Sequence, residues 1–241
     1  MSKTKGTKSS AGKSLSDPSL TGRKEKIRVK TVNKRSTSSA RWLERQLNDP
    51  YVAEAQKRGL RSRAAFKLIE LDEKYKLLRK GLRVLDLGAA PGGWSQVAAE
   101  RVGPKGRVLA VDILAMDPLP GVTVMQQDFM ADEAPARIRA ALDGPADLVM
   151  SDMAAPTIGH TRTDHLRIMA MAETAYQFAA EVLAPGGTFL CKLFQGGATK
   201  DLLDLLKRDF EQVRHVKPPA SRADSAEIYV VATGFRGGKG S

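Results

Sequence analysis

The stretch VLDLGAAPGGWSQ, residues 84–96, joins a short apolar run to a loop of small residues with glycines at 88, 92 and 93. Gly88 and Gly92 would let the backbone approach a ligand closely. The dinucleotide fingerprint G-x-G-x-x-G is absent because residue 90 is Ala, and no Gly-Lys-Ser/Thr follows as in a P-loop. The loop therefore suits a nucleotide-like ligand that lacks the phosphates recognised by those two motifs.

Two aspartates stand where a bound nucleoside would need them. Asp112 ends the run VLAVD, 24 residues after Gly88, which is the usual place for a carboxylate that accepts hydrogen bonds from ribose hydroxyls. Asp128 ends the run VMQQD and suits an adenine amino group, with Phe129 beside it. Either aspartate alone could be an ordinary turn residue. Together with the loop, they predict S-adenosylmethionine, which contains adenosine but no phosphate.

The elements that must position these residues alternate from residue 82 onward. Strands are expected at 83–87, 107–111, 122–126, 147–150, 187–194, 211–216 and 226–233, and helices at 94–102, 133–142, 164–183 and 199–209. This alternation predicts an α/β fold with a mostly parallel sheet covered on both faces. Only the loop KPPASRADSA separates the last two strands. Because a parallel crossover needs a longer connection, we expect the final strand to run antiparallel.

The basic residues are concentrated ahead of the glycine-rich loop. The chain has 241 residues and a net charge of +12, with +10 in residues 1–41, +5 in 42–83 and −3 in 84–241. Residues 1–41 hold few apolar side chains, so we expect a disordered basic arm, followed by a single domain over 42–241. Residues 42–81 are expected to be helical and to face RNA. The uneven charge favours a nucleic-acid partner, although a solubilising tail has the same composition.

Composition argues against several other classes of protein. No apolar run reaches the roughly 18–20 residues of a membrane span. Cys191 is the only cysteine, so an internal disulfide and a CxxC zinc site are excluded, and the three histidines form no metal-ligand pattern. We expect a cytoplasmic, metal-independent protein that has no membrane partner and works as a monomer.

Five segments, in order, carry a resemblance to a known family. DLGAAPGGWSQ, SDMA, VLAPGG, KLFQG and SRADSAEIYVVATG resemble the FtsJ-like family of S-adenosylmethionine-dependent RNA 2′-O-methyltransferases, over about residues 41–234. Within this family they are most similar to the bacterial enzymes that methylate a uridine ribose in the A-loop of 23S ribosomal RNA. The resemblance implies a Rossmann-like methyltransferase fold with a seven-stranded sheet, S-adenosylmethionine as cofactor, and the large ribosomal subunit as partner.

The resemblance also implies a Lys-Asp-Lys-Glu set of catalytic residues. In this chain the set maps to Lys67, Asp152, Lys192 and Glu227, with Asp152 also at the cofactor, and Trp94 is implied to line the cofactor pocket. The expected topology supports the set, because Asp152 follows the fourth strand, Lys192 lies near the end of the fifth, and Glu227 opens the antiparallel last strand. A ribose hydroxyl is a weak nucleophile, so Lys192 is expected to act as a base or as an orienting cation.

A basic stretch, QKRGLRSR, comes just before Lys67. Its four cations are Lys57, Arg58, Arg61 and Arg63. Phosphate contacts there would position the target ribose without reading sequence, and the basic arm would add salt-sensitive affinity. Ser62 in the same stretch is a candidate N-cap for the helix that carries Lys67.

Some alternatives stay open at this stage. The family usually reads S-D-M-A-P-N after the fourth strand, whereas this chain reads SDMAAPTIGH, so contacts made by that loop are in doubt. The RNA could be a transfer RNA or a cap instead of ribosomal RNA. A non-catalytic ribosome-assembly protein that keeps the fold is a second class, and a nicotinamide-dependent oxidoreductase is a third, weakened by the absent fingerprint.

Overall fold

The computed structural model of this chain describes residues 43–237, except 45, 155–160 and 196–199. The predicted basic arm and the altered loop that begins at residue 155 lie outside the described residues. Contacts divide the chain into two units, Met1–Ala53 and Glu54–Ser241. The sheet, its covering helices and all the predicted site residues belong to the second unit.

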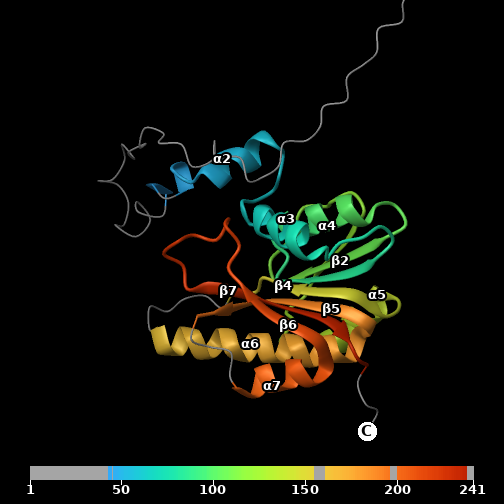
Figure 1. The fold of residues 1–241 in the computed structure, drawn as a ribbon. Coiled ribbons are helices and arrows are strands. Elements are labelled where there is room, and N and C mark those ends of the chain that lie inside the picture. The colour runs from blue at the N-terminus through green and yellow to red at the C-terminus, as the bar shows by residue number, and fades with distance from the viewer. Residues whose placement is uncertain (1–42, 45, 155–160, 196–199, 238–241) are drawn as a thin grey trace, which may run out of the picture. The chain divides into compact units, whose positions relative to one another are not determined.

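One seven-stranded sheet forms the centre of this unit (Figure 1). Its strand order is β3-β2-β1-β4-β5-β7-β6. The strands are β1 (Arg83–Leu87), β2 (Arg107–Asp112), β3 (Val122–Gln126), β4 (Ala146–Ser151), β5 (Leu183–Phe194), β6 (Phe210–Val216) and β7 (Glu227–Phe235). All seven predicted strands are confirmed. β7 pairs antiparallel with both β5 and β6, and the pairs among β1 to β5 are parallel, as the short final loop predicts.

Helices cover both faces of the sheet, as the alternating sequence predicts. They are α3 (Ala64–Tyr75), α4 (Gly93–Val102), α5 (Ala134–Leu142), α6 (Thr161–Val182) and α7 (Lys200–Asp209). An earlier helix, α2 (Pro50–Lys57), includes residues of both units and is not one of the helices that cover the sheet. In Figure 1, α3 and α4 lie above the sheet, and α6 and α7 lie below it. A loop without a helix, residues 113–121, joins β2 to β3.

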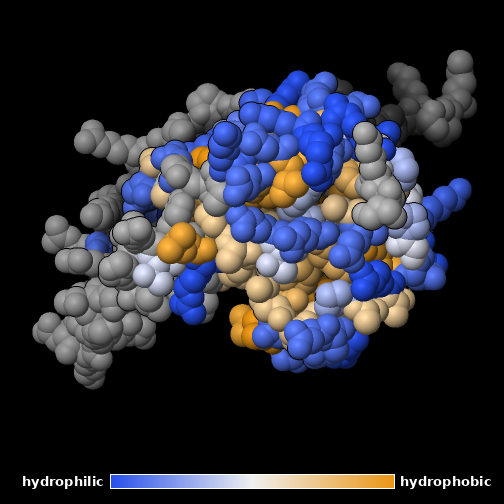
Figure 2. All heavy atoms as spheres, turned by 90° about the horizontal axis from the view of Figure 1, so that it is seen from below, coloured by the Kyte–Doolittle hydropathy of each residue, from blue (hydrophilic) through white to orange (hydrophobic). Residues whose placement is uncertain are grey.

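One core cluster lies between the sheet and helices α5, α6 and α7. Strand residues such as Leu85, Leu87 and Phe189 are fully buried and pack with Ile138 of α5 and Ala175 of α6. The β1 and β4 strands are buried along almost their whole length, which is why their sequences are apolar runs without alternation. The lower face presents hydrophilic side chains around a central area of moderately hydrophobic side chains (Figure 2). No helix among the described residues has the length and apolar character needed to span a membrane.

The expected N-cap at Ser62 is wrong. Helix α3 begins at Ala64, its N-cap position is Arg63, and no side chain caps it. The Ser62 hydroxyl is buried without a hydrogen-bond partner. It lies against Gly93 at the start of α4, where a Cβ atom would come within 2.3 Å of the Ser62 Oγ. Close packing of α3 on α4 therefore decides where this hydroxyl points.

Candidate active site

Four charged side chains meet at the carboxyl ends of the central strands. Asp152 directly follows β4, and Lys192 lies two residues before the end of β5. In the antiparallel register of β5 and β7, Lys192 pairs with Tyr229 and Phe194 pairs with Glu227, which brings Glu227 to the same edge. Lys67 reaches this edge from α3.

The distances show one connected cluster. The Lys67 Nζ lies 2.9 Å from each carboxylate oxygen of Glu227 and 3.9 Å from the Asp152 Oδ2. The Lys192 Nζ donates to the backbone carbonyl of Asp152 at 2.6 Å and lies 3.2 Å from its Oδ1. Both lysines are 7% exposed. The structure thus brings together the four residues predicted to be catalytic, and their catalytic roles stay predictions.

Charge pairing decides the ionisation of Asp152. Burial alone would raise the pKa of this carboxyl group. Lys192, Lys67 and the Tyr229 hydroxyl outweigh burial and hold the Asp152 pKa below its ordinary value. Asp152 is therefore a carboxylate at neutral pH and links the two lysines.

Tyr229 is a central member of this cluster that the sequence reading missed. Its hydroxyl donates to the Asp152 Oδ1 at 2.7 Å and accepts a hydrogen bond from the Lys67 Nζ at 3.1 Å. The side chain is fully buried. Burial and the nearby carboxylates of Asp152 and Glu227 raise the Tyr229 pKa well above its ordinary value, so the phenol keeps its proton. The period-2 alternation of a strand, which places Tyr229 on the same face of β7 as Glu227, could have revealed it.

Tyr229→Phe is expected to lower the free energy of unfolding by about 1–2 kcal/mol, because a buried acceptor on Asp152 and a donor on Lys67 each lose a partner. Methyl transfer should slow roughly tenfold, since Asp152 is then held less firmly. Denaturant titration and a single-turnover assay would measure the two effects. Tyr75→Phe is the matched control, because the described structure shows only cation–π contacts for that ring. Equal effects in the two variants would contradict the positioning role of Tyr229.

The glycine-rich loop lies directly beside this cluster. Gly88 has φ +77°, and a Cβ atom there would lie 2.6 Å from the Met153 Cγ and 2.9 Å from the Met153 backbone. Met153 follows Asp152 in the chain. Gly88 is therefore required both by its backbone conformation and by close approach to the segment that carries Asp152. A ligand bound on this loop would lie near the charged cluster.

Asp112 ends β2 and lies beside this loop, and Asp128 lies two residues beyond the end of the neighbouring strand β3. Asp112 accepts hydrogen bonds from the backbone N–H groups of Ala90, at 2.9 Å, and Leu114, at 2.8 Å. Asp128 accepts from the backbone N–H of Met130 at 2.9 Å. A carboxylate has about four acceptor positions, so both side chains keep capacity for ribose hydroxyls or an adenine amino group.

Large apolar side chains flank these two aspartates. Ile113, Leu114 and Met130 are 60%, 64% and 51% exposed. Exposed apolar side chains can pack against the flat faces of an adenine ring. Neighbouring carboxylates that keep acceptor capacity can accept hydrogen bonds from the polar groups of an adenosine. The loop, the aspartates and these side chains therefore fit the adenosine part of S-adenosylmethionine. The sequence reading overlooked the three apolar residues because single exposed hydrophobic residues are common.

Trp94 is placed for packing. Its ring is 3% exposed and lies 5.7 Å from the ring of Tyr229. The indole N–H donates to the backbone carbonyl of Ala64 at 2.8 Å, which ties α4 to the start of α3. Phe129 is likewise buried and packs against Phe178. A direct cofactor contact by Trp94 stays a prediction.

Asp86 on β1 is a buried acid that the sequence reading did not single out. One oxygen accepts from the Ser95 hydroxyl at 2.6 Å, and the other is buried without a hydrogen-bond partner. Burial raises the Asp86 pKa to about 7, against the opposing effect of the Ser95 hydrogen bond. Between about pH 4 and 7, the folded protein then keeps a proton that the unfolded chain has lost. The free energy of unfolding therefore falls as pH rises through this window.

Asp86→Asn is expected to remove this pH dependence. The difference in free energy of unfolding, variant minus wild type, should rise by about 2 kcal/mol from pH 5.5 to pH 8. The reason is that the wild type loses about 1.4 kcal/mol per pH unit up to the Asp86 pKa of about 7. Denaturant titrations of both proteins at the two pH values would measure the difference. A gap between variant and wild type that does not change with pH would show that Asp86 does not titrate in this range.

Three of the four predicted RNA-contacting cations are engaged within the protein. Arg58 pairs with Glu54 at 2.6 Å and lies over the Phe66 ring. Arg63 donates to the backbone carbonyl of Ala220. Arg61 donates to three backbone carbonyls, those of Pro91, Asp117 and Pro118. Lys57 is also exposed, and among these four it alone has no hydrogen bond, ion pair or ring contact in the described part of the chain.

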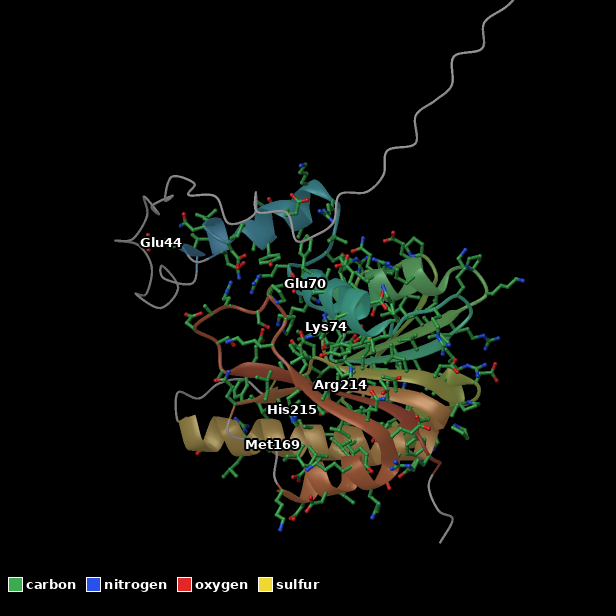
Figure 3. The ribbon with its side chains drawn as sticks, viewed as in Figure 1. Glu44, Glu70, Lys74, Met169, Arg214 and His215 are labelled. Atoms are coloured by element: carbon green, nitrogen blue, oxygen red, sulfur yellow. The ribbon has the colours of Figure 1, made fainter. Side chains whose placement is uncertain are left out.

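Other cations face solvent near the end of α3. Lys74 of α3 and Arg214 of β6 lie on one side of the molecule (Figure 3). Their charged groups lie 5.3 and 5.8 Å from the centre of the Tyr75 ring. Among the described residues, no group of three or more His, Cys, Asp or Glu side chains is arranged to hold a metal ion.

Comparisons with known proteins agree with this geometry. The model of the FtsJ-like methyltransferase family matches residues 60–235. Ribosomal RNA large subunit methyltransferase E of Paramagnetospirillum magneticum is 61% identical over 238 residues, covering 96% of this chain and 98% of that protein. The protein of the same name from Xanthobacter autotrophicus is 63% identical over 219 residues, covering 90% of this chain and 86% of that protein.

A solved structure is also similar. A crystal structure from Plasmodium falciparum, described as that of a ribosomal RNA methyltransferase, has a TM-score of 0.66 and 35% identity. The match covers 73% of this chain and 99% of that chain. The family match over most of the chain and the long, highly identical relatives lead to one conclusion. The chain belongs to the FtsJ-like methyltransferase family, and its cofactor is S-adenosylmethionine.

Proposed function

We propose that this protein methylates the 2′-hydroxyl of a uridine ribose in the A-loop of 23S ribosomal RNA, within the large ribosomal subunit. The observation that carries the proposal is the buried cluster of Lys67, Asp152, Lys192 and Glu227 beside the glycine-rich loop. Relatives named ribosomal RNA large subunit methyltransferase E, about 60% identical over nearly the whole chain, support this choice of RNA.

Bound S-adenosylmethionine supplies an electrophilic methyl group. The chain's own task is to hold a ribose hydroxyl in line with that group and to help the hydroxyl lose its proton as its oxygen takes the methyl group. Two acceptors on Asp152 fix the Lys192 Nζ. An ammonium group has three N–H donors, so one remains for the target hydroxyl. Lys67, Glu227 and Tyr229 hold Asp152, and thereby Lys192, in place.

The structure also disfavours methylation of a base carbon through a cysteine. Such a reaction needs a reactive thiolate. Cys191 is buried, and burial raises its pKa to about 12. A thiol with that pKa, inside β5 and away from solvent, is a poor nucleophile at neutral pH. A hydroxyl target, which needs no covalent intermediate with the protein, fits the cluster better.

RNA would be held by the exposed cations around α3. Lys57, Lys74 and Arg214 are exposed, and cations of this kind contact phosphates without reading sequence. The ribosomal RNA would then supply much of the specificity through its own shape. We also propose that the protein works as a monomer in the cytoplasm, where the proposed substrate would be found.

The proposal is tested by mapping ribose methylation on 23S ribosomal RNA from a strain that lacks this gene. One uridine 2′-O-methyl group in the A-loop should disappear in the deletion strain. It should return with the wild-type gene and stay absent with the Lys192→Ala variant. An unchanged methylation map would refute the choice of substrate.

A further inference from the structure

Arg61 connects the two loops that form the proposed cofactor site. One terminal nitrogen of its guanidinium group donates to the backbone carbonyls of Pro91, at 3.2 Å, and Asp117, at 2.7 Å. The other terminal nitrogen donates to the carbonyl of Pro118 at 2.6 Å. Pro91 belongs to the glycine-rich loop, and Asp117 and Pro118 belong to the loop 113–121, which also carries the apolar residues flanking Asp112. One side chain therefore joins both loops.

The stem of Arg61 also packs against the glycine-rich loop. Gly92 has φ +101°, and a Cβ atom there would lie 2.8 Å from the Leu119 Cδ1, 2.9 Å from the Met116 Sδ and 3.2 Å from the Arg61 Cδ. The loop 113–121 and Arg61 thus press on the same point of the glycine-rich loop. Only a glycine fits between them in this backbone conformation.

Gln96 of α4 fixes the backbone around Arg61. Its side-chain oxygen accepts from the Arg61 N–H at 3.0 Å, and its side-chain nitrogen donates to the Gly59 carbonyl at 2.9 Å. Gln96 also follows the glycine-rich loop directly, in the first turn of α4. The position of Arg61 is therefore set from the same helix whose start carries the loop.

We propose that Arg61 is a positioning residue for the cofactor site, and that it sets the affinity for S-adenosylmethionine instead of contacting an RNA phosphate. The inference rests on the proposed function only in the identity of the cofactor. By holding both loops in the binding geometry before the ligand arrives, Arg61 lowers the ordering cost of binding. The three carbonyl acceptors occupy three of its five N–H donors, which leaves little of the group for a phosphate.

The planar fork of arginine is what this site requires. Its guanidinium group is rigid, so its N–H donors have fixed angles and can bind carbonyls of both loops at once. A lysine at position 61 would keep the positive charge, and with it most of the long-range attraction to RNA. It could not reach the same three carbonyls with a fixed geometry. Arg61→Lys therefore removes the fixed contacts with the two loops but keeps the charge, whereas Arg61→Ala removes both.

The test compares Arg61→Ala and Arg61→Lys with wild type, after thermal unfolding has confirmed that each variant is folded. Calorimetry with S-adenosylhomocysteine, in the absence of RNA, should give a Kd about tenfold higher in both variants, which is the effect of losing roughly one net hydrogen bond. The KM for S-adenosylmethionine should rise similarly, with kcat within about threefold of wild type. Binding of 23S ribosomal RNA transcripts and its salt dependence should stay as in wild type in Arg61→Lys, which keeps the charge.

Lys57→Ala is the matched control, because Lys57 lies in the same basic stretch but has no hydrogen bond or ion pair with either loop in the described part of the chain. It should leave the Kd for S-adenosylhomocysteine unchanged and reduce the slope of log affinity for RNA against log salt by about 0.7–0.9. The proposal is overturned if both Arg61 variants keep the wild-type Kd for S-adenosylhomocysteine, whatever happens to RNA binding. If wild type itself fails to bind S-adenosylhomocysteine, the proposed function fails, and this outcome is distinct from the first. Should Arg61→Ala not fold, Arg61→Lys alone decides the result.

Discussion

Lys192→Ala is expected to lower the rate of methyl transfer to large ribosomal subunits by about 100- to 10,000-fold. Removing one preorganised donor from an active site costs roughly 100–1,000-fold, and positioned proton-transfer groups contribute about 100–10,000-fold. Lys192 is positioned for either role, as a hydrogen-bond donor or as a proton-transfer group, because its Nζ is fixed by the Asp152 carbonyl and carboxylate. A single-turnover assay with saturating S-adenosylmethionine would measure the loss directly.

Cofactor binding should survive this substitution. The Lys192 side chain contacts Asp152, whereas the proposed adenosine site is formed by the glycine-rich loop, Asp112 and Asp128. The Kd for S-adenosylhomocysteine should therefore stay within about threefold of wild type, since no adenosine contact is removed. Lys207→Ala, on the exposed face of α7, is the control for removing a lysine and should change neither quantity. A Lys192→Ala protein with wild-type turnover would exclude Lys192 from the reaction.

Asp152→Asn is expected to cost both stability and activity. The carboxylate lies between two largely buried lysines, 3.2 Å from the Lys192 Nζ and 3.9 Å from the Lys67 Nζ. Without its charge, Lys67 keeps its pair with Glu227, whereas Lys192 has no paired carboxylate in the described structure. Breaking a buried charge pair typically costs about 3–5 kcal/mol, and we expect about 3 kcal/mol here because the Asp152 side chain is 18% exposed. Methyl transfer should fall at least about a hundredfold, because Lys192 loses its orienting partner.

Denaturant titration at pH 7 would measure the stability loss, with Asp204→Asn on the exposed face of α7 as the control. The Asp152 pKa lies below its ordinary value, so its contribution is present at neutral pH and is lost as pH falls through the folded-state pKa. Adding Lys192→Met to Asp152→Asn should restore part of the stability, since Lys192 is the lysine left without a paired carboxylate, whereas Lys67 keeps Glu227. If Asp152→Asn unfolds at the wild-type denaturant concentration, the cluster does not depend on this charge.

The fold could be predicted from the sequence because its signals are local. Runs such as 83–87 and 122–126 are the right length for strands and end at turn residues, and the structure has both with these bounds. The β5 strand begins four residues earlier than predicted, at Leu183. The added segment, LAPG, is not an apolar run, and it joins the pairing with β4 through a register shift. Parallel topology then carries Asp152 and Lys192 to one edge, as the order of elements requires.

The sequence could not show which charged groups pair with backbone. Arg61 looks like a solvent-facing cation in QKRGLRSR, yet its carbonyl partners lie 30, 56 and 57 residues away. Neither periodicity nor charge counting detects such contacts, because both treat arginine as a surface charge. The Ser62 hydroxyl likewise follows the packing of α3 on α4 and not its local capping preference. Asp86 reads as an ordinary residue inside a strand until its complete burial is known.

The central claim is that this chain transfers a methyl group to a ribose hydroxyl of large-subunit ribosomal RNA. The most direct test incubates the purified protein and labelled S-adenosylmethionine with large subunits from the deletion strain, then digests the RNA to nucleosides. The predicted product is labelled 2′-O-methyluridine, one per subunit, with none formed by Lys192→Ala. Label on a base, or no label with wild-type protein that binds S-adenosylhomocysteine, would contradict the account.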